Sequence, residues 1–188
     1  MGSNCGGRNH RWKYVGELQK HIKVDRYGGC GPLKCPGHFT KDCDEISKYK
    51  FYLSFENSNC DEYITEKLWW NAYAKNAIPI VMGTSKQLYR QLLPPNSYIN
   101  VDDFASPRDL ANYVTYLNNN PSEMKEYFRW KRYFKVLNEH GYFRTNSVHY
   151  CRICEALNYN NKQNKVYTKL EDFWSRNNCY PAWDENLV

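Results

Sequence analysis

The chain has 188 residues, of which 41% are hydrophobic and 16% aromatic, and its formal net charge is +6. This length and composition exclude a disordered chain and indicate one domain with a packed core. No apolar run approaches the roughly 20 residues of a membrane-spanning helix. The positive charge is not gathered into a basic run, which favours small anionic ligands over nucleic acid.

The first predicted elements are a helix and a short strand. Residues 11–22 carry apolar side chains at helical spacing: Trp12, Val15, Leu18 and Ile22. Residues 22–27 predict a strand that ends at Gly28-Gly29. A parallel sheet normally has a strand before its first helix, and only four residues precede Cys5. We therefore expect a strand of the sheet to be missing.

The next segment, residues 28–50, is rich in Gly, Pro and Lys and predicts loops. It contains three of the eight cysteines, Cys30, Cys35 and Cys43. Eight cysteines are many for a cytosolic protein of this size, so they indicate an oxidising compartment. Because no Cys-x-x-Cys pair occurs in this segment, local disulfides are favoured over a zinc site.

The central stretch, residues 51–83, predicts a strand–loop–helix–strand unit. Phe51–Phe55 has the alternation of a buried strand, and polar, turn-forming residues follow it. Thr65 can act as the N-cap of a helix that continues to about residue 76. Ile78–Met82 is a second apolar strand and ends at Gly83. Such units build parallel sheets with ligand-binding loops at the carboxyl ends of the strands.

The loop of this unit has the features of an anion site. A helix N-terminus offers unpaired N–H groups and a partial positive charge. Lys67 stands in the first turn, where a cation is unfavourable unless an anion such as phosphate lies beside it. Glu66, Tyr63 and Asn57 add a carboxylate, a phenol and an amide. The alternative is that Glu66 is an ordinary first-turn acid and Lys67 a solvated charge.

The remaining elements continue the alternation of helices and strands. A helix is predicted over residues 85–93, a strand over residues 97–101, and helices are predicted to begin at Ser106-Pro107 and Asn120-Pro121. This order predicts a parallel, Rossmann-like α/β domain. Cys151 and Cys154 form a Cys-x-x-Cys pair, which could be a redox motif, half of a zinc site or a pair of structural cysteines.

Three motifs carry a resemblance to a known family: Phe55-Glu56-Asn57-Ser58, Tyr63-Ile64-Thr65-Glu66-Lys67 and Ile78-Pro79-Ile80-Val81-Met82-Gly83. Supporting matches lie at residues 3–5, 24–28, 98–104 and 127–130. Together they resemble the donor-binding signature of the α1,3-fucosyltransferases, glycosyltransferase family ten. The resemblance covers most of residues 3–154, and residues 49–60 look most similar to the invertebrate core α1,3-fucosyltransferases.

The resemblance implies an α/β fold with a Rossmann-like parallel sheet, the C-terminal domain of a two-Rossmann-domain (GT-B-type) glycosyltransferase. Residues 1–154 would be a nucleotide-sugar donor-binding domain, truncated at its N-terminus, and residues 155–188 a C-terminal tail packed on it. An acceptor domain and a type II signal anchor would lie upstream. The chain therefore looks like a C-terminal fragment of a Golgi membrane enzyme whose catalytic part is lumenal.

The implied reaction is the inverting transfer of fucose from GDP-fucose to a GlcNAc residue of a glycoprotein glycan, in the N-glycan core or an antenna. No metal or other cofactor is expected, nor a nucleic-acid partner. The general base would be a carboxylate of the missing domain, so no catalytic residue is expected in this chain. A non-catalytic GDP-sugar-binding module, or an inactive fragment, is the alternative.

By the same resemblance, five residues would bind the donor: Arg11, Asn57, Tyr63, Glu66 and Lys67. Arg8 is the rival of Arg11, and both could instead be surface arginines. The resemblance also makes six cysteines candidates for structural disulfides: Cys30, Cys35, Cys43, Cys151, Cys154 and Cys179. Cys179 is a candidate partner for Cys151 or Cys154. Cys60 lies inside the donor loop, where it would either bridge and fix the loop or remain a free thiol.

Overall fold

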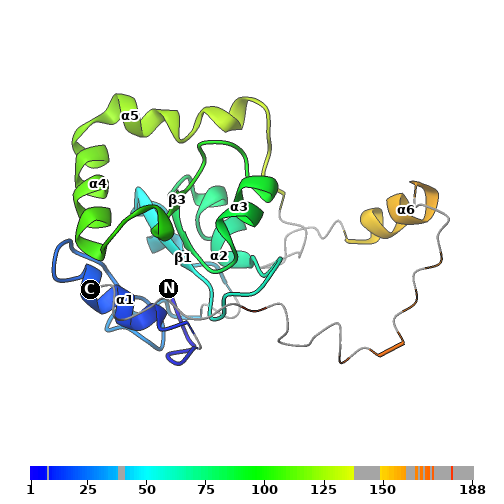
Figure 1. Ribbon diagram of the computed structural model, residues 1–188, viewed down its shortest axis with the longest axis horizontal. Helices are drawn as coiled ribbons and strands as arrows, with labels where there is room; N and C mark the ends of the chain where they lie inside the picture. Colours follow the sequence, from blue (N-terminus) through cyan, green and yellow to red (C-terminus); the bar gives the residue numbers. More distant parts are fainter. Residues whose placement is uncertain are drawn as a thin grey trace.

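A three-stranded parallel sheet forms the centre of the protein (Figure 1). The structure is a computed structural model that describes residues 1–7, 9–37, 41–137 and 149–159, and residues 164, 166, 168, 169, 171 and 179. The strands β1 (Phe51–Phe55), β2 (Ile78–Met82) and β3 (Ile99–Asn100) lie in the order β1-β2-β3. Phe55 pairs with Met82, and Val81 with Asn100. The carboxyl ends of the strands therefore meet at one edge.

Helices cover both faces of this sheet. The α-helices are α1 (Arg11–Leu18), α2 (Glu66–Trp69), α3 (Lys86–Leu92), α4 (Pro107–Asn119), α5 (Pro121–Glu126) and α6 (His149–Tyr159). The short 3-10 helices are η1 (Asp44–Lys48), η2 (Tyr73–Lys75), η3 (Val101–Asp103) and η4 (Arg129–Arg132). None of the helices within the described residues is long and apolar enough to cross a membrane.

The alternation of side chains along β2 divides the core into two layers. Ile78, Ile80 and Met82 pack with α1 and α4 on one face. Val81 points to the opposite face, where it packs with α2, α3 and Trp130. Because both faces are covered, all five residues of β2 are buried, as expected for a parallel strand. The predicted α/β fold with a parallel sheet is confirmed.

Most predicted elements occur where the sequence places them. The strands at residues 51–55 and 78–82 are confirmed with the predicted bounds. Ser106 caps α4 by accepting a hydrogen bond from the Asp109 N–H at 3.2 Å, with Pro107 as the first helical residue. Ser85 caps α3 in the same way, from the Leu88 N–H at 3.3 Å. The hydrophobic periodicity and the capping residues were therefore sufficient to predict these elements from the sequence.

The predicted helix over residues 65–76 is divided. The chain leaves α2 at Trp69 and turns before η2 begins at Tyr73. Leu68 and Tyr73 pack beneath Val81, whereas Ala72 joins a separate cluster with Tyr52. The segment therefore contributes to two clusters through two short helices, and it is more bent than its periodicity predicts.

The predicted strand at residues 22–27 is wrong. The backbone there accepts local hydrogen bonds instead, from the Gln19 side chain to Val24 O at 2.8 Å and from the Leu33 N–H to Arg26 O at 3.1 Å. A groove of about 530 Å³ is lined by this segment and by β1. Among the described residues, only Tyr27 of this segment pairs with another backbone, in an isolated bridge to Leu33, so no ladder forms. The expectation that one strand of the sheet is missing stays a prediction.

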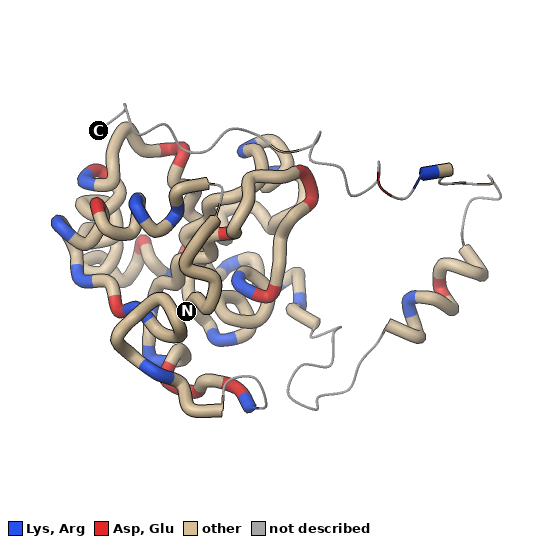
Figure 2. Tube along the Cα trace, turned by 90° about the horizontal axis from the view of Figure 1, so that it is seen from below, with Lys and Arg blue, Asp and Glu red and all other residues tan. Residues whose placement is uncertain are grey.

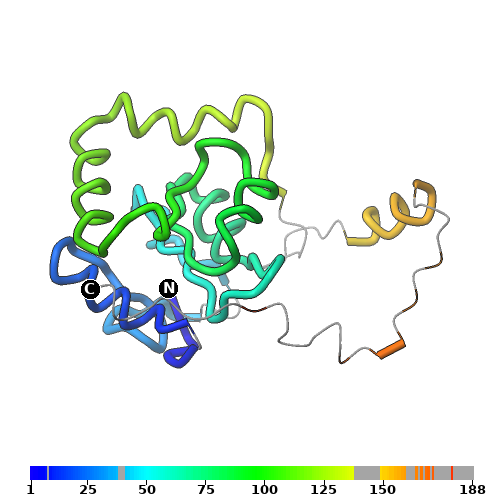
Figure 3. Tube along the Cα trace, viewed as in Figure 1, coloured from blue at the N-terminus to red at the C-terminus, as the bar shows by residue number. Residues whose placement is uncertain are grey.

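Three disulfides are present, Cys5–Cys30, Cys35–Cys43 and Cys60–Cys179. The expected pairing of Cys179 with Cys151 or Cys154 is wrong, because Cys179 bonds Cys60 in the donor loop. Cys151 and Cys154 are free and exposed on α6, which stands apart from the sheet (Figure 1). Figure 3 follows the chain from its N-terminus beside α1 to this distant helix. Helix α6 crosses the expected boundary at residue 154, and most of the expected tail lies outside the described residues.

The structure predicts a large cost for truncating the inner face of α4. Leu110 is fully buried, so Leu110→Ala should lower the free energy of unfolding by about 2–5 kcal/mol through lost burial and a cavity. Urea denaturation would measure it. Asn112→Ala, on the exposed face of α4, should change the free energy by less than about 0.5 kcal/mol. Similar effects of the two changes would contradict the observed orientation of α4.

The disulfide pattern predicts the number of reactive thiols. The unreduced protein should contain two titratable thiols, those of Cys151 and Cys154, and six cysteines in disulfides. Thiol titration followed by non-reducing peptide mapping would measure both quantities. A peptide that links Cys179 to Cys151 or Cys154 would contradict the observed Cys60–Cys179 bond.

Candidate functional site

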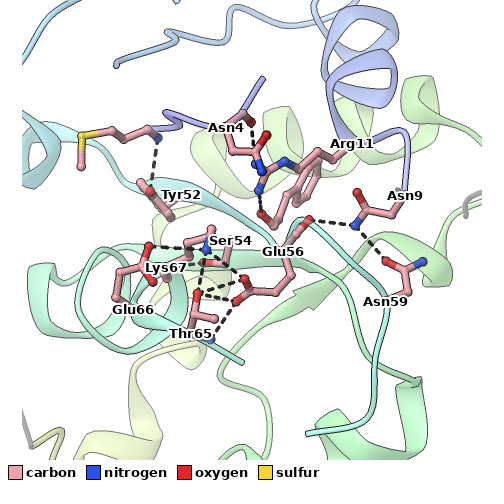
Figure 4. Close-up of polar contacts among 12 residues, drawn as sticks. Asn4, Asn9, Arg11, Tyr52, Ser54, Glu56, Asn59, Thr65, Glu66 and Lys67 are labelled. Atoms are coloured by element: carbon pink, nitrogen blue, oxygen red, sulfur yellow. Dashed lines mark hydrogen bonds and ion pairs between the residues drawn. The ribbon is translucent and has the colours of Figure 1, made fainter. Parts of the chain in front are cut away.

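The candidate site lies at the carboxyl edge of the sheet, where β1 runs into the loop before α2 (Figure 4). In parallel α/β sheets this edge is where ligands bind. Helix α2 is fixed against β1 by a hydrogen bond from the Ser54 hydroxyl to Lys67 O at 3.1 Å. The first turn of α2 is therefore held beside the end of the strand.

Glu56, the first residue after β1, organises this edge. Its side chain is only 2% exposed. The carboxylate accepts hydrogen bonds from the Thr65 N–H at 2.8 Å, from the Thr65 hydroxyl at 2.9 Å and from Lys67 Nζ at 2.9 Å. Thr65 takes the predicted N-cap position, but its own side chain makes no capping bond. Glu56 was not among the predicted donor-binding residues, although it stands in the Phe55-Glu56-Asn57-Ser58 motif and directly follows a buried parallel strand.

Lys67 is not the solvated charge of the alternative interpretation. Its side chain is 15% exposed and its ammonium group also donates to the Thr65 hydroxyl at 2.7 Å. Glu66 forms a second ion pair with it at 3.4 Å and is 40% exposed. Figure 4 shows Lys67 between the two carboxylates. Because α2 has only four residues, its N-terminal partial charge is small, whereas the Lys67 ammonium carries a full positive charge.

Arg11 is not a surface arginine. It is 5% exposed, and its guanidinium donates hydrogen bonds to Phe55 O and Asn4 O, both at 2.8 Å. Burial lowers the pKa of Arg11, and the negative charge of Glu56 opposes this shift. The first residue of α1 is thereby joined to the end of β1. Arg8, the rival position, lies outside the described residues.

The two cations of the site lie near a common point. The amine of Met1 donates a hydrogen bond to the Tyr52 hydroxyl at 3.2 Å. Burial, with added repulsion from Arg11 and Lys67, lowers the pKa of this amine to about 5. Arg11 donates to Phe55 O and Lys67 to the Glu56 carboxylate, so the two cations contact consecutive residues at the end of β1. Two converging positive charges are suited to an anion such as a diphosphate.

Tyr63 and Asn57 lie at the border of this region. Tyr63 is half-buried, and its N–H donates to Cys60 O at 3.3 Å. The Cys60–Cys179 disulfide ties down the same loop. Asn57 is half-buried, and its carbonyl would lie 3.3 Å from a Cβ at Gly7, whose φ is +150°. The structure thus pairs Glu66 with Lys67, places Lys67 and Arg11 on consecutive residues at the end of β1, and puts Asn57 and Tyr63 in the loop that follows.

The same edge contains buried polar atoms that make no hydrogen bond to the described residues: Asn9 Oδ1 and Arg11 Nε. The Asn9 amide nitrogen, in contrast, donates to Glu56 O at 2.8 Å and to Asn59 Oδ1 at 2.9 Å. Buried polar atoms without a partner are rare in folded proteins and call for an explanation such as a bound ligand or water. Asn9, like Glu56, lies at this edge and was not among the predicted donor-binding residues.

Within the described ranges, no group of three or more His, Cys, Asp or Glu side chains is placed to hold a metal ion. Figure 2 shows basic and acidic residues interspersed along the described chain. The expectations of metal-free donor binding and of no nucleic-acid partner stay predictions.

Comparison with known proteins identifies the family. The profile described as "Glycosyltransferase family 10 (fucosyltransferase) C-term" matches residues 1–174. The chain is 43% identical over 176 residues to glycoprotein 3-alpha-L-fucosyltransferase A of Drosophila melanogaster, covering 92% of this chain and 33% of that protein. It is 36% identical over 187 residues to alpha-(1,3)-fucosyltransferase fut-1 of Caenorhabditis elegans, covering 94% and 41%.

A solved structure described as "Crystal Structure of alpha1,3-Fucosyltransferase with GDP-fucose" has the same fold. The TM-score is 0.59 at 24% sequence identity, over 89% of this chain and 48% of that chain. This likeness bears on the fold alone. The chain spans about a third to two fifths of the length of the two relatives above. These matches confirm the resemblance found in the motifs: the chain belongs to glycosyltransferase family 10, the fucosyltransferases, and matches the C-terminal domain of that family.

Proposed function

We propose that this chain is the donor-binding part of an inverting α1,3-fucosyltransferase, which transfers fucose from GDP-fucose to a GlcNAc residue of a glycoprotein glycan. The observation that carries the proposal is that Arg11 and Lys67 contact consecutive residues, Phe55 and Glu56, at the carboxyl edge of a parallel sheet. The names of the family relatives support the reaction class, and the Drosophila relative's name supports a glycoprotein acceptor.

The residues of the site take distinct parts in this proposal. When the bond between fucose and the β-phosphate breaks, negative charge develops on the diphosphate, and Arg11 and Lys67 stabilise it. Glu66, which is 40% exposed, accepts hydrogen bonds from ribose or fucose hydroxyls. Asn57 and Tyr63 hold the nucleotide sugar in place. The general base that deprotonates the acceptor hydroxyl comes from outside these 188 residues.

Two further parts of the proposal concern metal and location. Two cations beside the diphosphate make a bound metal unnecessary for charge stabilisation. Three disulfides favour an oxidising compartment, which supports a lumenal location in the Golgi apparatus. Attachment to the Golgi membrane would be made by an anchor outside the chain.

A non-catalytic GDP-sugar-binding module is the second candidate. It is favoured by one observation: the chain spans 33% and 41% of the lengths of its two relatives, whose activity belongs to the longer proteins. Both candidates share the nucleotide-sugar site and differ only in whether transfer occurs. The following two experiments address the site and the transfer separately.

Lys67→Ala should weaken GDP binding by about 1–3 kcal/mol, because a charge-assisted contact to the diphosphate is lost. Isothermal titration calorimetry with GDP would measure the change. Lys48→Ala is the matched control: Lys48 pairs with Glu45 at 2.6 Å on the exposed surface, so the same net charge is lost away from the site. Equal GDP affinities of Lys67→Ala and Lys48→Ala would refute the role given to Lys67.

The purified chain alone should bind GDP-fucose and transfer little or no fucose, because the general base lies outside it. A transfer assay with GDP-fucose and a GlcNAc-terminated glycopeptide, read by mass spectrometry, would measure this. Robust transfer would show that a base lies within these residues. Glu66→Gln would then be the first variant to examine, since Glu66 is the more exposed carboxylate beside Lys67.

A further inference from the structure

Glu56 is the buried carboxylate of the site to which the proposed reaction gives no part. Its main chain is fixed at two points: the Glu56 N–H donates to Met82 O at 2.9 Å, and Glu56 O accepts from the Asn9 side chain at 2.8 Å. The residue therefore links β1, the end of β2 and the segment before α1. Its position is set by the core of the domain and not by the loop that follows it.

Gly83, the residue after β2, leaves space for the Glu56 side chain. A Cβ added at Gly83 would lie 3.2 Å from both Cβ and Cγ of Glu56, and 2.9 Å from the Tyr89 hydroxyl. Any side chain at Gly83 would therefore displace Glu56 or Tyr89. The glycine that ends the motif after β2 is thus needed for the placement of Glu56.

Glu56 determines where the Lys67 ammonium lies. Its carboxylate binds Lys67 Nζ at 2.9 Å and also the Thr65 hydroxyl at 2.9 Å, which itself accepts from Lys67 Nζ at 2.7 Å. A lysine side chain has many rotamers, and fixing it on ligand binding is costly. Here two fixed partners hold the ammonium before any ligand arrives. With its side chain only 2% exposed, Glu56 is enclosed, whereas Glu66 on the other side of Lys67 is open to a ligand.

We propose that Glu56 is a positioning residue for the donor: it acts through Lys67, whose ammonium it holds at the place where the diphosphate binds. This inference rests on the proposed function of the site. It adds that Glu56, in the Phe55-Glu56-Asn57-Ser58 motif at the end of β1, contributes to donor affinity by pre-organising Lys67, without contact to the nucleotide sugar.

The test is a double-mutant cycle on GDP affinity. Glu56→Gln keeps the size of the side chain but removes the charge that holds the ammonium, so GDP binding should weaken about tenfold. In the Lys67→Ala background the same change should cause no further loss, because the group that Glu56 positions is gone. Circular dichroism and thermal unfolding would establish that each variant is folded.

A matched control is provided by a second ion pair, between a buried lysine and a partly exposed carboxylate. Lys75, 5% exposed, pairs with Asp42 at 2.5 Å, away from the carboxyl edge of the sheet. Asp42→Asn should lower thermal stability and leave the GDP affinity of the folded protein unchanged.

If Glu56→Gln does not fold, Glu56→Asp replaces it, because the shorter carboxylate no longer reaches Thr65 and Lys67 together. Glu56→Asp should also weaken GDP binding in the wild-type background and cause no further loss of GDP affinity in the Lys67→Ala background.

The outcomes separate the two proposals. If Lys67→Ala weakens GDP binding and the Glu56 variant does not, or if the two losses add, the positioning role is wrong and the donor site stands. If neither Lys67→Ala nor the Glu56 variant alters GDP binding, the proposed donor site itself is wrong. A loss with the Glu56 variant that disappears in the Lys67→Ala background supports the positioning role.

Discussion

The buried ion pair between Glu56 and Lys67 is the interaction on which the site depends. It joins the end of β1 to the first turn of α2 at 2.9 Å, and the same carboxylate satisfies the Thr65 N–H. Removing one member of such a pair typically costs about 3–5 kcal/mol, because a buried charge is left without its partner. One carboxylate thus fixes both the start of a short helix and the cation that the donor needs.

The parallel sheet makes this arrangement possible. Strands β1 and β2 end side by side, with Phe55 opposite Met82, so Glu56 and Gly83 follow them at the same edge. Arg11 reaches this edge from α1 through its bond to Phe55 O. Segments separated by more than 50 residues in sequence therefore contribute to one anion site. The disulfide of Cys60 adds a covalent constraint on the loop between them.

Sequence patterns predicted those features that depend on local signals. Apolar runs located β1 and β2, Ser106-Pro107 located the start of α4, and the motif after β1 located Glu66 and Lys67. The prediction of a strand at residues 22–27 was wrong because a strand needs a neighbouring strand to pair with. The sequence of one segment does not show whether such a neighbour exists. Glu56 was missed because its burial depends on contacts with β2 and Gly83. The Cys60–Cys179 bond spans 119 residues, and cysteine spacing does not determine such connectivity.

The central claim is that a nucleotide diphosphate binds between Arg11 and Lys67. A crystal structure of the chain with GDP tests it most directly. The account predicts diphosphate oxygens within about 3 Å of Lys67 Nζ and of the Arg11 guanidinium, with Glu56 still bound to Lys67. GDP bound elsewhere on the domain, with the Lys67 ammonium away from the diphosphate, would contradict it.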